Sequence, residues 1–246
     1  MDATSYVTLS HMTALRRQME MIANNLANMS TTAYKAEKPL FTQFLNPTVW
    51  GADRPRGDDA ISYVEDFGVV RNLQIGTITQ TDNPLDIAIN GNGYYQVETP
   101  EGVRYTRSGA FSLSADRQIV TREGHPLLDD AGQPIEIPQG ARAMTISVDG
   151  TVSADNLQVA RIVPVDFANE RALKKLPSGL YETDQQPTPL ERFDLRQGMI
   201  EGSNVQPILE MTNMIEVSRA YQTAQKFVEQ EHQRVKNAIG KLAGNG

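Results

Sequence analysis

The sequence predicts an α+β protein, with N- and C-terminal α-helices that form a coiled-coil-like assembly core and a central, mostly antiparallel β domain. Two observations predict this class. Near both ends of the 246-residue chain, apolar residues recur at alternating spacings of three and four, the pattern of a coiled-coil seam. Between them, residues 61–183 alternate in short apolar runs separated by Asn-Gly and Asp-Gly turn signals, a pattern typical of antiparallel strands.

The N-terminal assembly helix is expected within residues 1–33, with its end near the Ser30-Thr31-Thr32 cluster. Its seam consists of Met12, Leu15, Met19, Ile22, Leu26 and Met29. Beside the seam, within about one turn, lie three asparagines: Asn24, Asn25 and Asn28. Such residues either mark a helix end or set the register between packed helices through buried amides. The sequence leaves both interpretations open.

The middle of the chain divides into three expected segments. Prolines and glycines punctuate a connector at residues 34–60, the β domain spans 61–183, and a return segment spans 184–206. Hairpin turns are expected in the β domain at Asn90-Gly91, Asn92-Gly93, Glu101-Gly102, Glu123-Gly124, Ala131-Gly132 and Asp149-Gly150. Together these turns predict a meander that closes into a sandwich or barrel.

The C-terminal assembly helix is expected over residues 207–246. It begins near Pro207, because the proline ring fits the first helical position. Its seam consists of Met214, Val217, Tyr221, Ala224, Val228, Val235, Ala238 and Leu242, and only Glu231 breaks the pattern. A seam needs a partner, so the two ends are expected to meet, within one molecule or between copies. Ordering a helix costs about 1–2 kcal/mol per residue in backbone entropy. The terminal helices are therefore expected to be mobile in the monomer and to become ordered only on assembly, when further copies cover both seams.

Composition excludes several classes of protein. The formal charge is −7, and the first and last 40 residues each carry +1, which leaves −9 for the middle. A nucleic-acid-binding protein would instead need a basic face. The chain has no cysteine, which excludes disulfides and thiolate metal sites. No apolar run approaches the ~20 residues of a membrane span, and no cleaved secretory signal is expected.

Few residues suggest catalysis, so no enzyme activity, cofactor or metal is expected. The three histidines form no recognisable metal or triad pattern. Gly91-Asn92-Gly93 lacks the third glycine of a dinucleotide fingerprint. A glycosidase needs two facing carboxylates, and the candidates are Asp82, Asp86, Asp129 and Asp130. Acidic residues are common in turns, so a structural role is favoured for all four.

Four segments together resemble the flagellar rod and hook family. Residues 24–35 (NNLANMSTTAYK) resemble its N-terminal signature, and residues 201–221 (EGSNVQPILEMTNMIEVSRAY) resemble its C-terminal one. Residues 84–97 (PLDIAINGNGYYQV) and 105–111 (YTRSGAF) are similar to its β body. The chain departs from the family pattern at Ala33, where glycine is usual, and at Asp116-Arg117, where Asp-Gly is common.

The resemblance implies a structural subunit of the bacterial flagellar basal-body rod, which polymerises through its terminal helices and transmits torque from motor to hook. It implies export by the flagellar type III apparatus without a cleaved signal, and a location in the periplasmic rod. The implied partners are other copies and neighbouring rod proteins, with no nucleic acid and no membrane insertion. Besides the seams and the three asparagines, the expected assembly interface includes Ser203, Asn204, Val205, Met211 and Ile215.

Chain length leaves two rod proteins of this family open, one proximal and one distal. Met1-Asp2 with Tyr6-Val7, and the stretch from Val205 to Ile208, are more similar to the proximal-rod protein. A different class of function is a peptidoglycan-binding β module on a helical stalk, which would bind its ligand as a monomer without polymerising.

Overall fold

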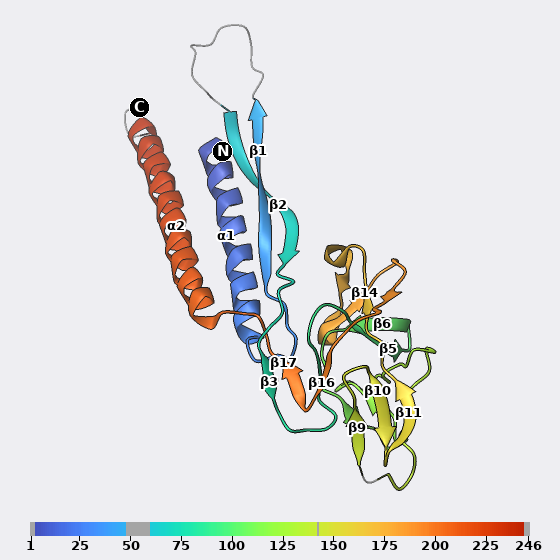
Figure 1. The fold of residues 1–246 in the computed structure, drawn as a ribbon. Helices are drawn as coiled ribbons and strands as arrows, with labels where there is room; N and C mark the ends of the chain where they lie inside the picture. Colours follow the sequence, from blue (N-terminus) through green and yellow to red (C-terminus); the bar gives the residue numbers. More distant parts are fainter. Residues whose placement is uncertain (1–2, 48–59, 142, 244–246) are drawn as a thin grey trace. The chain divides into compact units, whose positions relative to one another are not determined.

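The computed structural model describes residues 3–47, 60–141 and 143–243, which form two compact units (Figure 1). Unit 1 comprises Met1–Ala27, Glu37–Arg71 and Gln206–Gly246. Unit 2 comprises Asn28–Ala36 and Asn72–Val205. The terminal helices flank an antiparallel β region in the sequence, so the predicted α+β class is confirmed. No helix among these residues is both long and apolar enough to span a bilayer.

Unit 1 contains helices α1 (Ala3–Ala27) and α2 (Pro207–Ala243) and a hairpin of strands β1 (Glu37–Pro47) and β2 (Ala60–Arg71). Figure 1 shows α1 between α2 and this hairpin, and α1 contacts all three elements. The predicted helix start at Pro207 is confirmed. The first intrahelical bond of α2 runs from the Glu210 amide to the Gln206 carbonyl at 3.0 Å. The Glu210 carboxylate in this first turn also complements the helix dipole.

The two predicted seams pack against each other within unit 1. Leu15 and Ile22 of α1 and Val217 of α2 form a buried cluster. Met19, Met214 and Tyr221 are half-buried against it. The residues repeat at spacings of three, four and seven, so apolar side chains return to the same side of each helix every two turns. The α1–α2 pairing that the seams predict is therefore formed within the single chain.

The segment expected as a connector contains a strand. Residues 37–47 pair with residues 60–71 in antiparallel register, from Glu37 opposite Arg71 to Pro47 opposite Ala60. A bulge between Leu40 and Phe41 shifts this register. Pro39 and Pro47 had argued against a strand, but a two-stranded ribbon leaves one side of each strand without ladder bonds, where proline is tolerated. Residues 48–59 of the expected connector lie outside the described residues.

Unit 2 is built from short strands. Its larger sheets have the orders β13-β14-β6-β5 and β11-β10-β9. The remaining strands of the unit form the two-stranded pairs β12-β15, β16-β4, β17-β3 and β7-β8. All the strand pairs in the described residues are antiparallel, as predicted, but they form several small sheets in place of one meander. The bounds are β3 Ile78–Gln80, β4 Ile87–Ile89, β5 Tyr95–Thr99, β6 Gly102–Thr106, β7 Ser112–Leu113, β8 Ile119–Val120, β9 Met144–Ile146, β10 Thr151–Ala154, β11 Leu157–Arg161, β12 Val165–Asp166, β13 Lys174–Lys175, β14 Leu180–Glu182, β15 Thr188–Pro189, β16 Leu195–Gln197 and β17 Met199–Glu201.

Two short 3-10 helices, η1 (Glu170–Ala172) and η2 (Pro177–Gly179), complete unit 2. The expected return segment contributes β15, β16 and β17 to its sheets.

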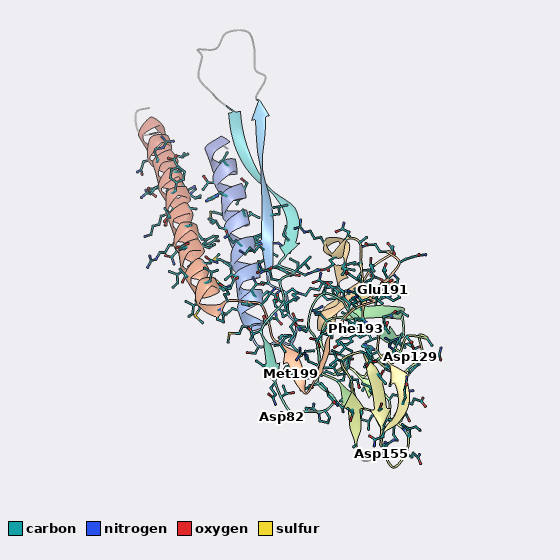
Figure 2. The ribbon with its side chains drawn as sticks, in the orientation of Figure 1. Asp82, Asp129, Asp155, Glu191, Phe193 and Met199 are labelled. Carbon is teal, nitrogen blue, oxygen red and sulfur yellow. The ribbon has the colours of Figure 1, made fainter. Side chains whose placement is uncertain are left out.

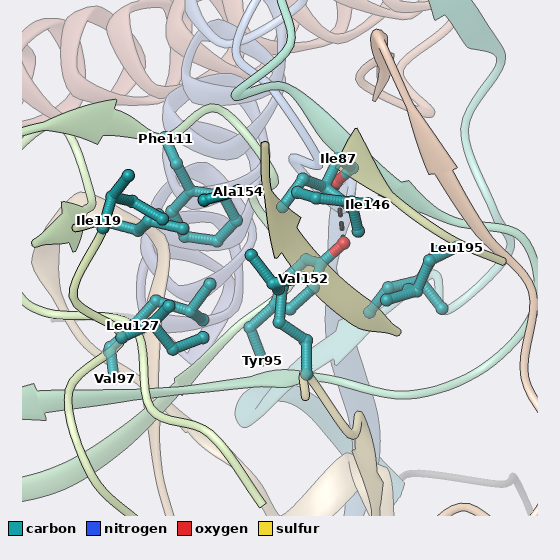
Figure 3. Close-up of a cluster of buried hydrophobic side chains, with 14 of the residues drawn as sticks. Ile87, Tyr95, Val97, Phe111, Ile119, Leu127, Ile146, Val152, Ala154 and Leu195 are labelled. Atoms are coloured by element: carbon teal, nitrogen blue, oxygen red, sulfur yellow. Dashed lines mark hydrogen bonds between the residues drawn. The ribbon is translucent and has the colours of Figure 1, made fainter. Parts of the chain in front are cut away.

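An apolar core holds the small sheets of unit 2 together (Figure 3). Its largest fully buried side chain, Tyr95, donates its hydroxyl to the Ile87 carbonyl at 2.7 Å. The Tyr95 ring also meets Phe111 edge to face at 5.2 Å. Burial raises the pKa of the Tyr95 phenol far above its usual value. The hydroxyl therefore remains a neutral hydrogen-bond donor.

Most predicted turns of the β domain are confirmed. Glu101-Gly102 lies in the β5–β6 hairpin, and Asp149-Gly150 joins β9 to β10. The hairpin predicted at residues 90–93 is wrong. β4, which precedes this loop, pairs with β16, while β5, which follows it, pairs with β6. The glycines here instead allow the loop to wrap around a buried side chain.

Candidate functional site

A buried cluster of three charged residues lies in unit 2. Glu201, the last residue of β17, accepts from Lys35 Nζ at its Oε1 and from Arg107 Nε at its Oε2, both at 2.7 Å. The three side chains are only 2–6% exposed. Lys35 also donates to the Gln74 carbonyl at 2.8 Å, and the Gly76 amide donates to Glu201 Oε1 at 3.0 Å. Each charge is therefore paired and hydrogen-bonded, as burial requires.

The loop at residues 90–93 forms a cradle for the Arg107 guanidinium. Arg107 Nη1 donates to the Gly93 carbonyl at 2.6 Å, and Nη2 donates to the carbonyls of Ile89 and Gly91. Gly91 and Gly93 have φ of +132° and +123°, which L-residues rarely adopt. The glycines thus turn the loop so that its carbonyl oxygens satisfy a buried cation.

The charges of this cluster hold one another in their ionised forms. Burial pushes the pKa of Glu201 upward, but Arg107 and then Lys35 lower it below the usual value for a carboxyl group. Burial lowers the pKa of Lys35, and its bond to Glu201 opposes that shift. At the edge of the cluster, burial and the neighbouring Asp166 raise the pKa of Glu170. Glu201 is therefore the counter-ion for both buried cations.

Each of the four segments identified in the sequence contributes to this cluster. Lys35 ends residues 24–35, and Glu201 begins residues 201–221. Arg107 comes from residues 105–111, and the cradle comes from residues 84–97. Sequence reasoning missed these charged residues, although each lies inside a segment that it singled out. The signal that could have found them is that Lys35 and Arg107 are the only charged residues of their segments, 24–35 and 105–111, and that Glu201 is an acidic residue in a third segment.

A second polar contact, within unit 1, involves the predicted Asn25. Its Oδ1 accepts from the Glu37 amide at 3.0 Å, and its Nδ2 donates to the Glu37 carbonyl at 2.8 Å and to Glu210 Oε1 at 3.4 Å. Asn25 is buried, and Glu210 beside it is buried as well. One amide thus fixes α1 against the start of β1 and the first turn of α2.

Replacing Asn25 with alanine is expected to lower the free energy of unfolding by about 2 kcal/mol, because the part-buried amide and carbonyl of Glu37 lose their partner. Urea denaturation measures this change. Gln233→Ala is the control, since that exposed side chain donates to Asn237 on the surface of α2, and a change within about 0.5 kcal/mol is expected. Equal effects of the two substitutions would contradict a register role for Asn25.

The other predicted interface residues fall into two groups. The first is at least half-buried: Met12, Leu15, Met19, Ile22, Leu26, Asn28, Ser203, Asn204, Val205, Met214, Val217, Tyr221 and Ala224. The second is exposed: Asn24, Met29, Met211, Ile215, Val228 and Val235. The side chains of the predicted seam residues Ala238 and Leu242 lie outside the described part of the structure. Packing within one chain thus accounts for most of the seam. Whether either group forms contacts between copies stays a prediction.

Both departures from the family pattern adopt the left-handed backbone that glycine would favour. Ala33 has φ +54° and Arg117 has φ +62°. The Ala33 amide donates to the Glu201 carbonyl at 2.8 Å, and Arg117 donates from its guanidinium to the carbonyls of Ile137 and Pro138. These hydrogen bonds offset part of the free-energy cost of the left-handed backbone, which is roughly 1–2 kcal/mol for an L-residue.

Three of the four carboxylates considered for catalysis accept local hydrogen bonds. The buried Asp86 accepts from the side chains of Thr81 and Asn83. Asp129 Oδ1 accepts from the amides of Ala131 and Gln133, and Asp82 Oδ1 accepts from Gln80. Figure 2 shows Asp82 and Asp129 on different loops of unit 2. Within the described ranges, no group of three or more acidic or histidine side chains is placed to hold a metal ion.

Three family models match the chain. "Flagella basal body rod protein" matches residues 6–35, "Flagellar hook protein FlgE/F/G D1 domain" matches 88–154, and "Flagellar basal body rod FlgEFG protein C-terminal" matches 196–240. Together these models cover most of α1, part of the central β region and most of α2.

Full-length relatives agree with these models. The chain is 36% identical over 245 residues to the flagellar basal-body rod protein FlgF of Caulobacter vibrioides, covering 98% of each chain. It is 29% identical to FlgF of Rhizobium meliloti, covering 100% of both. With FlgG of Agrobacterium fabrum it shares 32% identity, over 90% of this chain and 92% of that protein.

Proposed function

This chain belongs to the flagellar basal-body rod protein family, and we propose that it serves as a structural subunit of the rod by polymerising through its two terminal helices. FlgF relatives match it essentially from end to end, whereas the FlgG match leaves more of the chain uncovered. The FlgF assignment is therefore favoured over FlgG. In this role the protein works mechanically, and its residues bind neighbouring subunits.

The observation that carries the polymerisation proposal is an exposed apolar stripe on α2. The stripe consists of Ile208, Met211 and Ile215, which are 83%, 49% and 53% exposed. At 100° per residue the stripe lies roughly 130° around the helix from the seam that packs on α1. α2 thus carries one apolar face that α1 covers and a second that is exposed among the described residues.

Further apolar side chains toward the C-terminal end of α2 add to this surface. Phe227, Val228 and Val235 are 38–42% exposed, and Val228 and Val235 continue the seam in phase. Burying a large apolar side chain stabilises contact by about 1.5–3 kcal/mol. Two apolar faces on one long helix support contact with more than one neighbouring copy, as a continuous polymer requires.

The finer parts of the proposal concern place and partners. The protein acts in the proximal part of the periplasmic rod, after export through the flagellar type III apparatus without a cleaved signal. Its partners are other copies of itself and neighbouring rod proteins, and it inserts into no membrane and binds no nucleic acid. The net negative charge of the middle of the chain supports the absence of nucleic-acid binding, because a protein that binds phosphate backbones requires a basic face. Close-packed terminal helices then transmit torque from motor to hook.

The depression beside the buried charged cluster does not support the alternative of a peptidoglycan-binding module. The depression lined by Lys35, Tyr94, Arg107 and Glu170 has a volume of about 10 Å³. That volume admits about one water molecule, and a sugar ring does not fit.

The proposal is tested by replacing Ile215 with aspartate in cells that lack the wild-type gene. A charge on the exposed stripe is expected to prevent rod assembly and abolish swimming, because each contact would bury an unpaired carboxylate. Electron microscopy of isolated basal bodies and motility in soft agar measure the two effects. The purified variant should keep its melting temperature, since Ile215 is exposed in the free protein.

Leu157→Asp is the matched control. Leu157 is a 70% exposed aliphatic residue on β11 of unit 2, so the same change in charge is expected to leave rods and swimming intact. Complete rods with Ile215→Asp, or equal loss with both substitutions, would contradict assembly through α2.

A further inference from the structure

Three segments of unit 2 lead directly to the elements of unit 1. Residues 28–36 join α1 to β1, residues 72–77 follow β2, and residues 199–205 precede α2. We call these three segments the collar. Every covalent connection between unit 2 and the helices or hairpin runs through one of them.

Asn204 links all three segments of the collar. Its Oδ1 accepts from the Ala36 amide at 2.7 Å, while its Nδ2 donates to the carbonyls of Asn72 and Gln74 at 2.9 and 2.8 Å. Its own amide donates to the Tyr34 carbonyl at 3.1 Å. One side chain therefore satisfies three backbone groups from two segments and holds both against its own.

Backbone bonds repeat the same connections. The Ala33 amide donates to the Glu201 carbonyl, the Asn72 amide to the Ala36 carbonyl, and the Gly202 amide to the Thr77 carbonyl, each at 2.8 Å. The segments also approach very closely. A Cβ atom on Gly76 would lie 2.0 Å from the Gly202 carbonyl oxygen, so only glycine permits this contact.

Two buried cations connect the collar to the rest of unit 2. Lys35 bridges the Gln74 carbonyl and Glu201, and so joins one residue from each segment. Arg107 extends the network from Glu201 to the loop at residues 89–93. Buried networks of this kind are cooperative, because losing one member weakens the bonds of the others.

We propose that the collar is a single cooperative body, in which Asn204 and Glu201 act as positioning residues for the three connecting segments. Load that enters unit 2 through any one segment is shared by all three and passes to the β body through Arg107. Without the hydrogen bonds between the segments of the collar, each segment would carry load alone and would unfold independently of the other two. This inference rests on the proposed function, since a rod subunit must carry torque through these connections.

The test compares Asn204→Ala with Gln197→Ala by amide hydrogen exchange. Gln197 is a matched control because its amide also bridges three backbone groups, from Pro84, Met144 and Ile146, away from the collar. Asn204→Ala is expected to speed exchange at Ala33, Asn72 and Gly202 roughly tenfold or more, although Asn204 bonds none of these amides directly. Amides of the β core, such as Leu127 and Ile135, should keep their rates.

Gln197→Ala is expected to leave the three collar amides unchanged. If Asn204→Ala affects only the Ala36 amide, the bonds are independent and no cooperative collar exists. If all amides of unit 2 speed up equally, Asn204 contributes only to global stability, and the inference is equally refuted.

Swimming under viscous load tests the mechanical part. Cells with Asn204→Ala are expected to assemble rods and to lose speed faster than wild-type cells as viscosity rises, while Gln197→Ala cells follow the wild type. Identical load curves for all three would overturn load sharing by the collar. That result would leave the rod function itself standing, because rod function is tested separately by the loss of rods with Ile215→Asp.

Discussion

Replacing Glu201 with glutamine is expected to lower the free energy of unfolding by about 3–5 kcal/mol. Removing one partner from a buried ion network leaves its opposite charges uncompensated, and here both Lys35 and Arg107 would be left without a counter-ion. The neutral amide keeps the shape of the side chain, so the loss reports charge and not packing. Urea denaturation at neutral pH measures the change.

The control for Glu201 is Glu182→Gln. Glu182 pairs with Arg104 at 2.8 Å, but its side chain is 33% exposed, and an ion pair near the surface contributes about 1 kcal/mol or less. If Glu201→Gln lowers the free energy of unfolding no more than Glu182→Gln does, the buried cluster contributes little to stability.

The effect of Glu201→Gln should also depend on pH. Arg107 and Lys35 outweigh burial and hold the pKa of Glu201 below its ordinary value of 4.5. A carboxyl group with a lowered folded-state pKa contributes stability above its unfolded-state pKa, and loses it as pH falls through the folded-state pKa. The difference between wild type and variant should thus be constant near neutral pH and shrink below about pH 4.5.

Replacing Gly109 with alanine is also expected to have a large effect, and should lower the free energy of unfolding by about 3 kcal/mol. An added Cβ would lie 1.7 Å from the Ile87 carbonyl oxygen, and backbone atoms cannot move aside as a flexible side chain can. The Ile87 amide donates to the Gly109 carbonyl at 2.9 Å, and Tyr95 donates to the Ile87 carbonyl. Any shift of Gly109 therefore disturbs the centre of the apolar core.

Gly124→Ala separates this steric effect from conformational strain. Gly124 has φ +90° with no atom within 4 Å of an added Cβ, so its substitution should cost about 1–2 kcal/mol through strain alone. Thermal unfolding of both variants measures the difference. Equal losses would mean that the close approach at Gly109 relaxes without cost.

Local patterns in the sequence were enough to predict both helices and most turns. The seam spacings and Pro207 placed α1 and α2 because helix periodicity depends on residues three and four apart. The Asp-Gly turn at 149–150 was equally visible, because its backbone preference is a property of those two residues. By contrast, the turn at Asp155-Asn156, where both residues have positive φ, has no glycine to reveal it.

Long-range pairing limited the remaining predictions. Lys35 and Glu201 are 166 residues apart and Arg107 and Glu201 are 94 apart, so no local rule joins them. The Asn-Gly pairs at 90–93 are predicted to form a hairpin because that is their commonest use. In the structure their loop instead supplies carbonyl acceptors to the buried Arg107 guanidinium. β1 was missed because its prolines argue against a strand, and only the pairing with β2 shows that they are tolerated.

We expect neighbouring subunits in the rod to cover the exposed apolar stripe of α2, and maleimide labelling measures this burial. The chain has no cysteine, so Ile215→Cys and Leu157→Cys each introduce a single reactive thiol. We predict that both label readily in the free protein, and that in isolated basal bodies Ile215→Cys becomes protected while Leu157→Cys stays reactive. Equal labelling of Ile215→Cys in free protein and basal bodies would contradict the claim.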